Sequence, residues 1–240
     1  MPRFYIAPPS GELVTLSGED ARHISRSLRM ALGETLTLCD GAGMDYSGVL
    51  CQIDSQTVTV RILESRPSKT EPTVFVRLYQ ALPKADKMEW IVQKAVELGV
   101  GEIVPVLTER CISRPDEKTM EKKRDRWQKI AAEAAKQCGR GRIPAVRPLL
   151  RFSAAAQELG QMEKGLFLYE KGGVPFREAL ATPAREIGLF VGAEGGFSPQ
   201  EAADVQRLGA CAVSLGSRIL RCETAPLAAL SVCMYETGNL

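Results

Sequence analysis

The sequence predicts an α/β protein in two parts, a small β-barrel followed by a larger domain built on a parallel sheet. Three observations lead to this prediction. The first seventy of the 240 residues contain short β-rich runs separated by turn residues. A polar segment with two prolines, residues 65–72, then interrupts the pattern. After it, strand patterns alternate with helical ones, so we expect domains at residues 1–70 and 71–240.

In the N-terminal part, three runs are β-branched or alternating: Glu34–Cys39, Tyr46–Ile53 and Gln56–Leu63. Such runs are typical of short strands. One helix is expected at Gly18–Met30, with Ser17 as its N-cap. Short strands at this spacing predict a small barrel.

The C-terminal part alternates strands and helices. The expected strands are Val74–Leu82, Glu102–Leu107, Leu166–Tyr169, Ile187–Val191 and Cys211–Leu215. The expected helices are one capped by Asp86 and ended by Gly99, then Glu117–Cys138, Pro199–Leu208 and Ala225–Tyr235. This order predicts a parallel sheet that is covered by helices on both faces.

Composition excludes several kinds of chemistry. The seven cysteines include no C-x-x-C pair, so we expect reduced thiols in a cytoplasmic protein rather than disulfides or a zinc site. His23 is the only histidine, which excludes histidine-rich metal sites. No apolar stretch is long enough to span a membrane. The net charge of +2 neither requires nor excludes nucleic acid. A metal-free enzyme, or one with an organic cofactor, remains.

The strongest local motif is the glycine-rich segment 192–201, which follows an apolar strand and leads into a helix. Ser198 is expected to cap this helix, with Pro199 at its first position and Glu201 completing a capping box. Glycines allow a ligand to approach the main chain, and ligands of α/β sheets bind beyond the carboxyl ends of strands. A plain tight turn explains the pattern equally well. The segment is neither a Walker A loop nor a dinucleotide fingerprint.

Two further loops are expected at the same edge of the sheet. Eight residues with three charges separate Gly216 from the last helix, whereas loops of this kind usually have about two to six residues. The extra length favours a functional loop. The alternative is that Arg221 and Glu223 form only a surface ion pair. A third loop, Glu170–Gly173, follows another strand. Together the three loops can form a single pocket.

Basic residues form three groups. The expected helix Glu117–Cys138 carries cations interleaved with acids, which indicates a solvated face. The segment Arg140–Arg142 is expected to be exposed and unbalanced by acid, as phosphate contacts require. A third group surrounds the N-terminal helix. The residues expected to contact RNA are Arg3, Arg22, His23, Arg26, Arg29, Arg140 and Arg142.

In these motifs the chain resembles, over nearly its whole length, the bacterial ribosomal RNA small-subunit methyltransferase E family. The matching segments are Arg22-His23, Leu28-Arg29, residues 94–100, Arg126-Trp127, residues 134–137, Arg140, residues 192–197, residues 215–216 and 219–221, and residues 223–225. The resemblance implies an N-terminal barrel similar to PUA RNA-binding domains, a C-terminal SPOUT domain with a trefoil knot, and a homodimer. It further implies S-adenosyl-L-methionine as cofactor and methylation at N3 of one uridine in the 16S rRNA of the small ribosomal subunit.

The same resemblance implies the residues of the site. The cofactor would be held by Leu168, Tyr169, Glu170, Val191, Gly192, Glu194, Gly195, Gly196, Leu215, Gly216, Ile219, Leu220, Arg221 and Thr224. We expect Arg221 to stabilise the uracil anion, and Glu223 to accept the N3 proton or to orient Arg221. Cys222 stands where the family usually has threonine and is given no catalytic role.

Three other functions remain open at this point. A related knotted methyltransferase with another target, such as a tRNA ribose 2′-hydroxyl, would carry the same loops. A non-catalytic RNA-binding or ribosome-assembly factor would use the same basic surfaces. A nucleotide-hydrolysing enzyme is disfavoured because the chain has no phosphate-cradling lysine motif.

Overall fold

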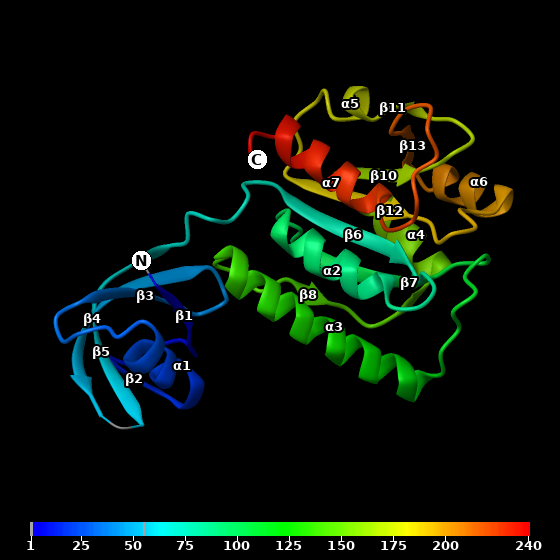
Figure 1. Cartoon of the computed structure of the whole chain (residues 1–240). Helices are drawn as coiled ribbons and strands as arrows, with labels where there is room; N and C mark the ends of the chain where they lie inside the picture. Colours follow the sequence, from blue (N-terminus) through cyan, green and yellow to red (C-terminus); the bar gives the residue numbers. More distant parts are fainter. Residues whose placement is uncertain (1, 55) are drawn as a thin grey trace. The chain divides into compact units, whose positions relative to one another are not determined.

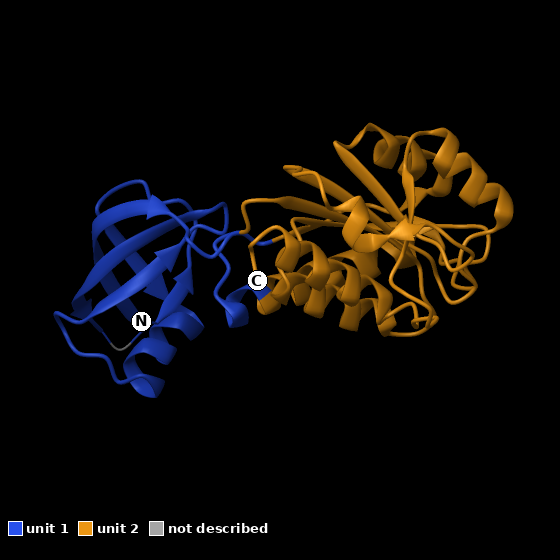
Figure 2. Ribbon diagram, turned by 90° about the horizontal axis from the view of Figure 1, so that it is seen from above, with its two compact units in different colours: residues 1–71, 135–143 blue, residues 72–134, 144–240 orange. Residues whose placement is uncertain are grey.

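The computed structural model describes residues 2–54 and 56–240. The chain forms two compact units (Figure 2). The first consists of residues 1–71 and 135–143, and the second of residues 72–134 and 144–240. Within the described residues, no helix combines the length and the apolar character needed to cross a membrane.

The first unit is a curled, mainly antiparallel sheet in the strand order β1-β3-β4-β5-β2. Its strands are β1 (Arg3–Tyr5), β2 (Leu13–Ser17), β3 (Thr35–Cys39), β4 (Met44–Ile53) and β5 (Thr57–Pro67). Register shifts in the β4–β5 pair increase the local bend of the sheet. The strands surround a core in which Leu36, Leu38, Val58 and Val60 are fully buried. The prediction that the N-terminal part is β-rich is confirmed, and its sheet forms a half-barrel (Figure 1).

The N-terminal helix differs from its prediction. Helix α1 (Gly18–Arg22) changes at His23 into a π-helical segment, η1 (His23–Ser27), so the helical region ends before Met30. Ser17 is at the N-cap position, but its side chain makes no capping hydrogen bond. A second difference concerns the expected linker: residues 65–67 continue strand β5 and pair with β4.

The second unit contains the parallel sheet, in the strand order β11-β13-β10-β12-β6-β7-β8, with β9 also paired to β7. Its strands are β6 (Phe75–Ala81), β7 (Glu102–Leu107), β8 (Ala145–Val146), β9 (Leu150–Arg151), β10 (Lys164–Leu168), β11 (Val174–Pro175), β12 (Glu186–Val191) and β13 (Cys211–Ser214). Every pairing between them is parallel. The predicted α/β fold with a parallel sheet is confirmed.

Helices cover this sheet on both faces (Figure 1). They are α2 (Lys87–Glu97), α3 (Glu117–Cys138), α4 (Phe152–Gln161), α5 (Phe176–Ala179), α6 (Pro199–Arg207) and α7 (Ala225–Glu236). Helix α2 contacts α7, and α4 contacts α6. As predicted, Gly99 ends α2 in the left-handed region, with φ +91°. Helix α4 was not predicted.

Candidate functional site: a cavity at the carboxyl edge of the parallel sheet

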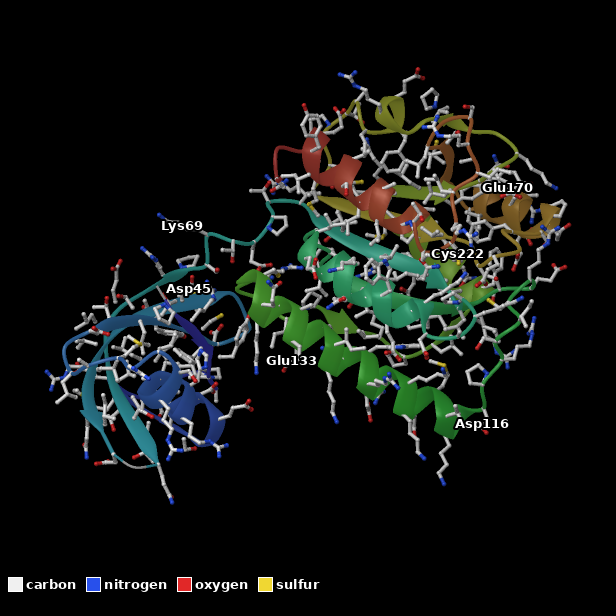
Figure 3. The ribbon with its side chains drawn as sticks, viewed as in Figure 1. Asp45, Lys69, Asp116, Glu133, Glu170 and Cys222 are labelled. Carbon is white, nitrogen blue, oxygen red and sulfur yellow. The ribbon has the colours of Figure 1, made fainter. Side chains whose placement is uncertain are left out.

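The order of the strands brings the three predicted loops together. β10 lies between β13 and β12, and β12 is also paired to β6. Because these four strands are parallel, the segments that follow Leu168, Val191 and Ser214 all leave the sheet at one edge. Glu170 and Cys222, from two of these segments, lie on the side of the unit toward which the strand arrows point (Figure 3).

A cavity of about 500 Å³ lies at this edge, which is within the range of small-molecule sites. It is lined by Lys87, Leu168, Tyr169, Glu170, Val191, Gly192, Ala193, Glu194, Gly195, Gly196, Val213, Ser214, Leu215, Gly216, Ser217, Arg218, Ile219, Leu220, Arg221, Cys222 and Ala225. Of the residues expected to hold a cofactor, Thr224 alone is not among those lining it. Thr224 instead is at the N-cap position of α7, where its side chain makes no capping hydrogen bond.

The glycine-rich loop is anchored at its far end. Ser198 and Glu201 form the predicted capping box: the Ser198 amide donates to Glu201 at 3.0 Å, and the Glu201 amide donates to the Ser198 hydroxyl at 3.3 Å. The ring of Phe197 is fully buried and meets Phe190 edge to face, with centroids 4.8 Å apart. These contacts anchor the end of the loop where it enters helix α6.

The segment after β7 supports the turn of the same loop. The Arg110 guanidinium donates to the carbonyl of Gly195 at 2.8 Å. The amide of Glu109 donates to the second oxygen of the buried Glu201 carboxylate at 2.7 Å. Because that carboxylate also accepts the Ser198 amide, it connects the two loops.

Two glycines keep the cavity open. Gly196 has φ +63°, and a Cβ there would lie 3.0 Å from a Glu170 carboxylate oxygen. Gly216 has φ +109°, and a Cβ there would meet no protein atom within 4 Å. The space in front of Gly216 is therefore free for a ligand, and the positive φ favours glycine at both positions.

One lysine binds two carboxylates at the cavity. The Lys87 ammonium lies 3.0 Å from Glu194 and 3.1 Å from Glu223, on two different loops. Hydrogen bonds to Glu194 and then Glu223 raise the pKa of Lys87. For each carboxylate, burial alone would raise the pKa, but hydrogen bonds outweigh burial and lower the pKa. Glu194 accepts these hydrogen bonds from backbone amides and from Lys87. Glu223 accepts them from Cys222, from its own amide and from Lys87. All three groups are therefore charged at neutral pH.

Other charged side chains at the cavity have no such partner. Among the described residues, no side chain forms an ion pair or a hydrogen bond with the side chains of Arg221, Arg218 or Glu170, although all three line the cavity. The surface ion pair considered for Arg221 and Glu223 is absent from the described interactions, since Glu223 binds Lys87. Arg221 is thus an exposed lining residue whose guanidinium is bound by no side chain of the described residues.

The residues predicted to contact RNA divide into two groups. Arg22, His23, Arg26, Arg29 and Arg142 are exposed. Arg3 and Arg140 are not free. The Arg3 guanidinium is hydrogen-bonded to Asp45 and to Ser68.

Arg140 corrects the prediction that residues 140–142 are exposed and unbalanced by acid. Its side chain is buried and lies 2.6 Å from the Glu71 carboxylate, which also accepts the amides of Gly141 and Arg142. Glycine spacing indicated flexibility, but the fold supplies an acidic partner from far along the chain. Arg142 alone of the two arginines keeps an exposed side chain.

The sequence reasoning missed Lys87 as a residue of the site. It identified Asp86 as the cap of α2, yet the Asp86 side chain makes no capping hydrogen bond. A lysine in the first turn of a helix is electrostatically unfavourable and was the available signal. Within the described residues, no group of histidine, cysteine and acidic side chains is arranged to hold a metal ion.

Comparison with known proteins agrees with this architecture. Residues 69–234 match the RNA methyltransferase domain family, and residues 16–63 match the RNA methyltransferase PUA domain family. The chain is 32% identical to ribosomal RNA small subunit methyltransferase E of Bacillus subtilis over 94% of its own length and 91% of the relative's. The chain belongs to the ribosomal RNA small subunit methyltransferase E family.

Solved structures of other proteins in this fold extend the likeness. The methyltransferase E of Neisseria gonorrhoeae, bound to S-adenosyl methionine, has a TM-score of 0.83 at 34% identity, covering 98% of this chain and 97% of that one. A putative methyltransferase of Legionella pneumophila, in complex with the same cofactor, has a TM-score of 0.82 at 34% identity, covering 97% and 96%. Two solved structures that are similar to nearly the whole of this chain therefore contain S-adenosyl methionine.

Proposed function

We propose that this chain is a methyltransferase of 16S rRNA that uses S-adenosyl-L-methionine and acts on N3 of one uridine, numbered 1498 in the bacterial reference. One observation carries the proposal: Arg221, whose side chain is bound by no other described side chain, lines a cavity formed largely by glycine-containing turns at the carboxyl edge of the sheet. Related structures with bound S-adenosyl methionine support the choice of cofactor.

The cavity fits this cofactor in size and in chemistry. Turns with little side chain, at Gly192, Gly195, Gly196 and Gly216, offer amides and carbonyls to the adenosine and methionine parts. The open space in front of Gly216 is available to the ligand. Leu168, Val191, Leu215 and Leu220 add apolar surface for the adenine ring. Tyr169, Glu170, Glu194 and Ile219 complete the set of lining residues proposed to hold the cofactor.

When bound, the sulfonium cofactor supplies an electrophilic methyl group, whose transfer breaks one S–C bond, forms one N–C bond and releases the N3 proton. The protein's first task would be alignment: the loops that line the cavity would hold donor and acceptor in line, which would lower the barrier without a covalent enzyme intermediate. Arg221 places its positive charge beside the uracil oxygens, where negative charge develops as N3 loses its proton.

Glu223 is proposed as the second catalytic group. It is ionised and is bound by Lys87, and its proposed role is either to accept the N3 proton or to set the position of the Arg221 loop. Glu223 is not among the residues that line the cavity, which favours the second role. Its lowered pKa makes it a weak base, which favours the positioning role.

The first unit is proposed to bind the RNA around the target. Its match to the PUA family and the exposed Arg22, His23, Arg26 and Arg29 support this role, and Arg142 adds a further exposed cation. Sequence-specific RNA recognition favours unpaired bases, so the uridine is expected to be flipped into the cavity. Arg3 and Arg140, whose side chains are already bound, would contribute through shape rather than through free charge.

The remaining expectations of the family resemblance belong to the same proposal. They are a division of labour between residues 1–70 and residues 71–240, a trefoil knot in the C-terminal part, a homodimer and a cytoplasmic location. None requires a metal ion.

The test is transfer of tritium from labelled S-adenosyl-L-methionine to small ribosomal subunits that lack the mark, followed by mapping of the modified nucleotide. We expect one methyl group at uridine N3. Label on tRNA ribose would favour the related methyltransferases instead. Failure of the chain to bind the cofactor in calorimetry would leave the non-catalytic RNA-binding factor as the better explanation.

A further inference from the structure

Lys87 occupies a position that helix energetics disfavour. It is the first residue of α2, where the exposed amides give the helix end a partial positive charge that opposes a cation. Its side chain lines the cavity and is about 30% exposed. The cost is offset because two carboxylates, Glu194 and Glu223, meet the ammonium there.

The loop before Lys87 is also strained. Ala85 has φ +53°, a left-handed conformation that residues with a Cβ rarely adopt. The same loop binds Glu194 a second time, because the amide of Lys84 donates to the same carboxylate oxygen at 3.1 Å. A strained backbone conformation persists only where surrounding contacts hold it, and residues with such conformations are common at functional sites.

The two carboxylates belong to two different loops that line the cavity, although the Glu223 residue itself is not among the lining residues. Glu194 lies in the glycine-rich loop after β12, and Glu223 lies in the loop after β13 that carries Arg221. In the sheet, β10 separates these two strands, so no strand pairing joins the walls directly. Lys87 connects them with one side chain from α2.

We propose that Lys87 is a positioning residue, which holds the two cavity walls in register and acts on the reaction through Glu223 and the Arg221 loop. This inference rests on the methyltransferase function proposed above. Without the ammonium, the Glu223 carboxylate keeps its hydrogen bond from Cys222 but loses its cationic partner, and it becomes available to the Arg221 guanidinium two residues away. That pairing would neutralise the charge intended for the uracil and would move the loop.

The experiment is a double-mutant cycle on the full-length protein. In the wild-type background, K87M is expected to lower kcat about 100-fold, the cost of a displacement of roughly 1 Å at a reacting centre. The KM for small subunits should change little, since Lys87 is assigned no RNA contact. Calorimetry should show weaker binding of the cofactor in K87M, because the two walls that contact it are no longer tied. K87R keeps the charge and can bind both carboxylates, so it should restore most of kcat.

The cycle then repeats K87M in an E223Q background. If Lys87 acts through Glu223, removing the lysine should cost much less once that carboxylate is neutral. Equal loss of kcat in both backgrounds overturns the inference, and so does a K87M enzyme with wild-type kcat. K94M, the same substitution on the outer side of α2 where Lys94 binds Glu97, is the matched control and should keep wild-type kcat.

Two further controls distinguish loss of folding from loss of turnover. Circular dichroism melting of each variant separates loss of folded protein from loss of turnover, and K87Q replaces K87M in the cycle if K87M does not fold. Absence of methyl transfer by the wild-type protein would overturn the proposed function itself. Wild-type transfer together with an additive cycle would overturn only the role of Lys87.

Discussion

The Glu71 carboxylate lies 2.6 Å from the buried guanidinium of Arg140 and accepts the amides of Gly141 and Arg142 as well. This group of contacts fixes the segment 135–143 to the half-barrel, since all of these residues belong to the first unit. One carboxylate therefore binds a buried guanidinium and accepts two main-chain amides.

Replacement of Glu71 by Gln is expected to lower the free energy of unfolding by about 3 kcal/mol, because it removes the Glu71 charge from beside a buried guanidinium. Denaturant titration followed by circular dichroism measures the change. E64Q is the control: it removes the charge of a glutamate on an exposed part of β5 and should have little effect. Equal unfolding curves for E71Q and the wild type would show that the pair adds nothing.

The same ion pair predicts a dependence on pH. Burial alone would raise the pKa of Glu71, but the Arg140 guanidinium and the two amides outweigh it and lower the pKa below its ordinary value of 4.5. A group with a lowered folded pKa stabilises the protein above its unfolded pKa and loses this effect as the pH falls through the folded pKa. Unfolding at a series of pH values should therefore show a loss below about pH 4.5 in the wild type that is smaller in E71Q.

Arg221→Ala is expected to lower kcat by about 100- to 1000-fold, the usual effect of removing one electrostatic donor from a developing anion. Cofactor affinity should fall much less, because main-chain groups make most of the proposed contacts. Single-turnover methyl transfer and calorimetry measure the two effects separately. A fully active R221A enzyme would exclude Arg221 from the mechanism.

Gly216→Ala tests directly whether the cofactor binds in the cavity. The new methyl group would project into space that is free of protein atoms, and φ +109° is unfavourable for alanine. We expect weaker cofactor binding together with a modest loss of stability. Gly238→Ala imposes a similar backbone cost at φ +70°, again in open space but outside the cavity lining, and should leave binding unchanged. Equal affinities in G216A and G238A would place the cofactor elsewhere.

Ser198→Ala should cost about 1 kcal/mol of stability, because it removes the capping hydrogen bond of α6. Ser17→Ala is the control, since Ser17 is at an N-cap position without a capping hydrogen bond and should be nearly neutral. Thermal melting of both variants provides the comparison. The proposed function adds that S198A also weakens cofactor binding, because the glycine-rich loop is then less firmly held.

Cys222 should resist alkylation although it lines the cavity. Burial, and then the hydrogen bond to Glu223, raise the pKa of its thiol to about 12, so the reactive thiolate is scarce at pH 8. Cys51 is exposed and serves as the internal comparison. Mass spectrometry after timed treatment with iodoacetamide should find Cys51 modified first. Equal rates at the two cysteines would contradict the assigned environment.

Elements with a strong local signal were predicted closely from the sequence. The bounds of α3 and the capping box of Ser198 and Glu201 are as expected, because periodicity and cap chemistry are local properties. The three loops were also identified, since a strand followed by glycines is visible in the chain. We inferred that the three loops lie together because parallel strands end at the same edge of a sheet. The observed strand order explains why they do.

The sequence predictions failed mainly for residues whose partners are distant along the chain. The buried Arg140 binds Glu71, which is 69 positions away, and no local pattern indicates that pairing. Lys87 is likewise separated by 107 residues from Glu194, so its role could not be read from the helix that it begins. The π-helical turn at His23–Ser27 lies in a sequence whose local pattern indicates an ordinary helix.

The cavity walls come from segments between residue 87 and residue 225, and the last of them lies close to the C-terminal helix. A nascent chain therefore has no complete binding site until β13 and the loop after it have been synthesised and have joined the sheet. Any ligand that fills the cavity touches all of these segments at once, so its binding energy opposes unfolding of the second unit as a whole. Occupancy would then report, in one measurement, that all of these segments have folded together.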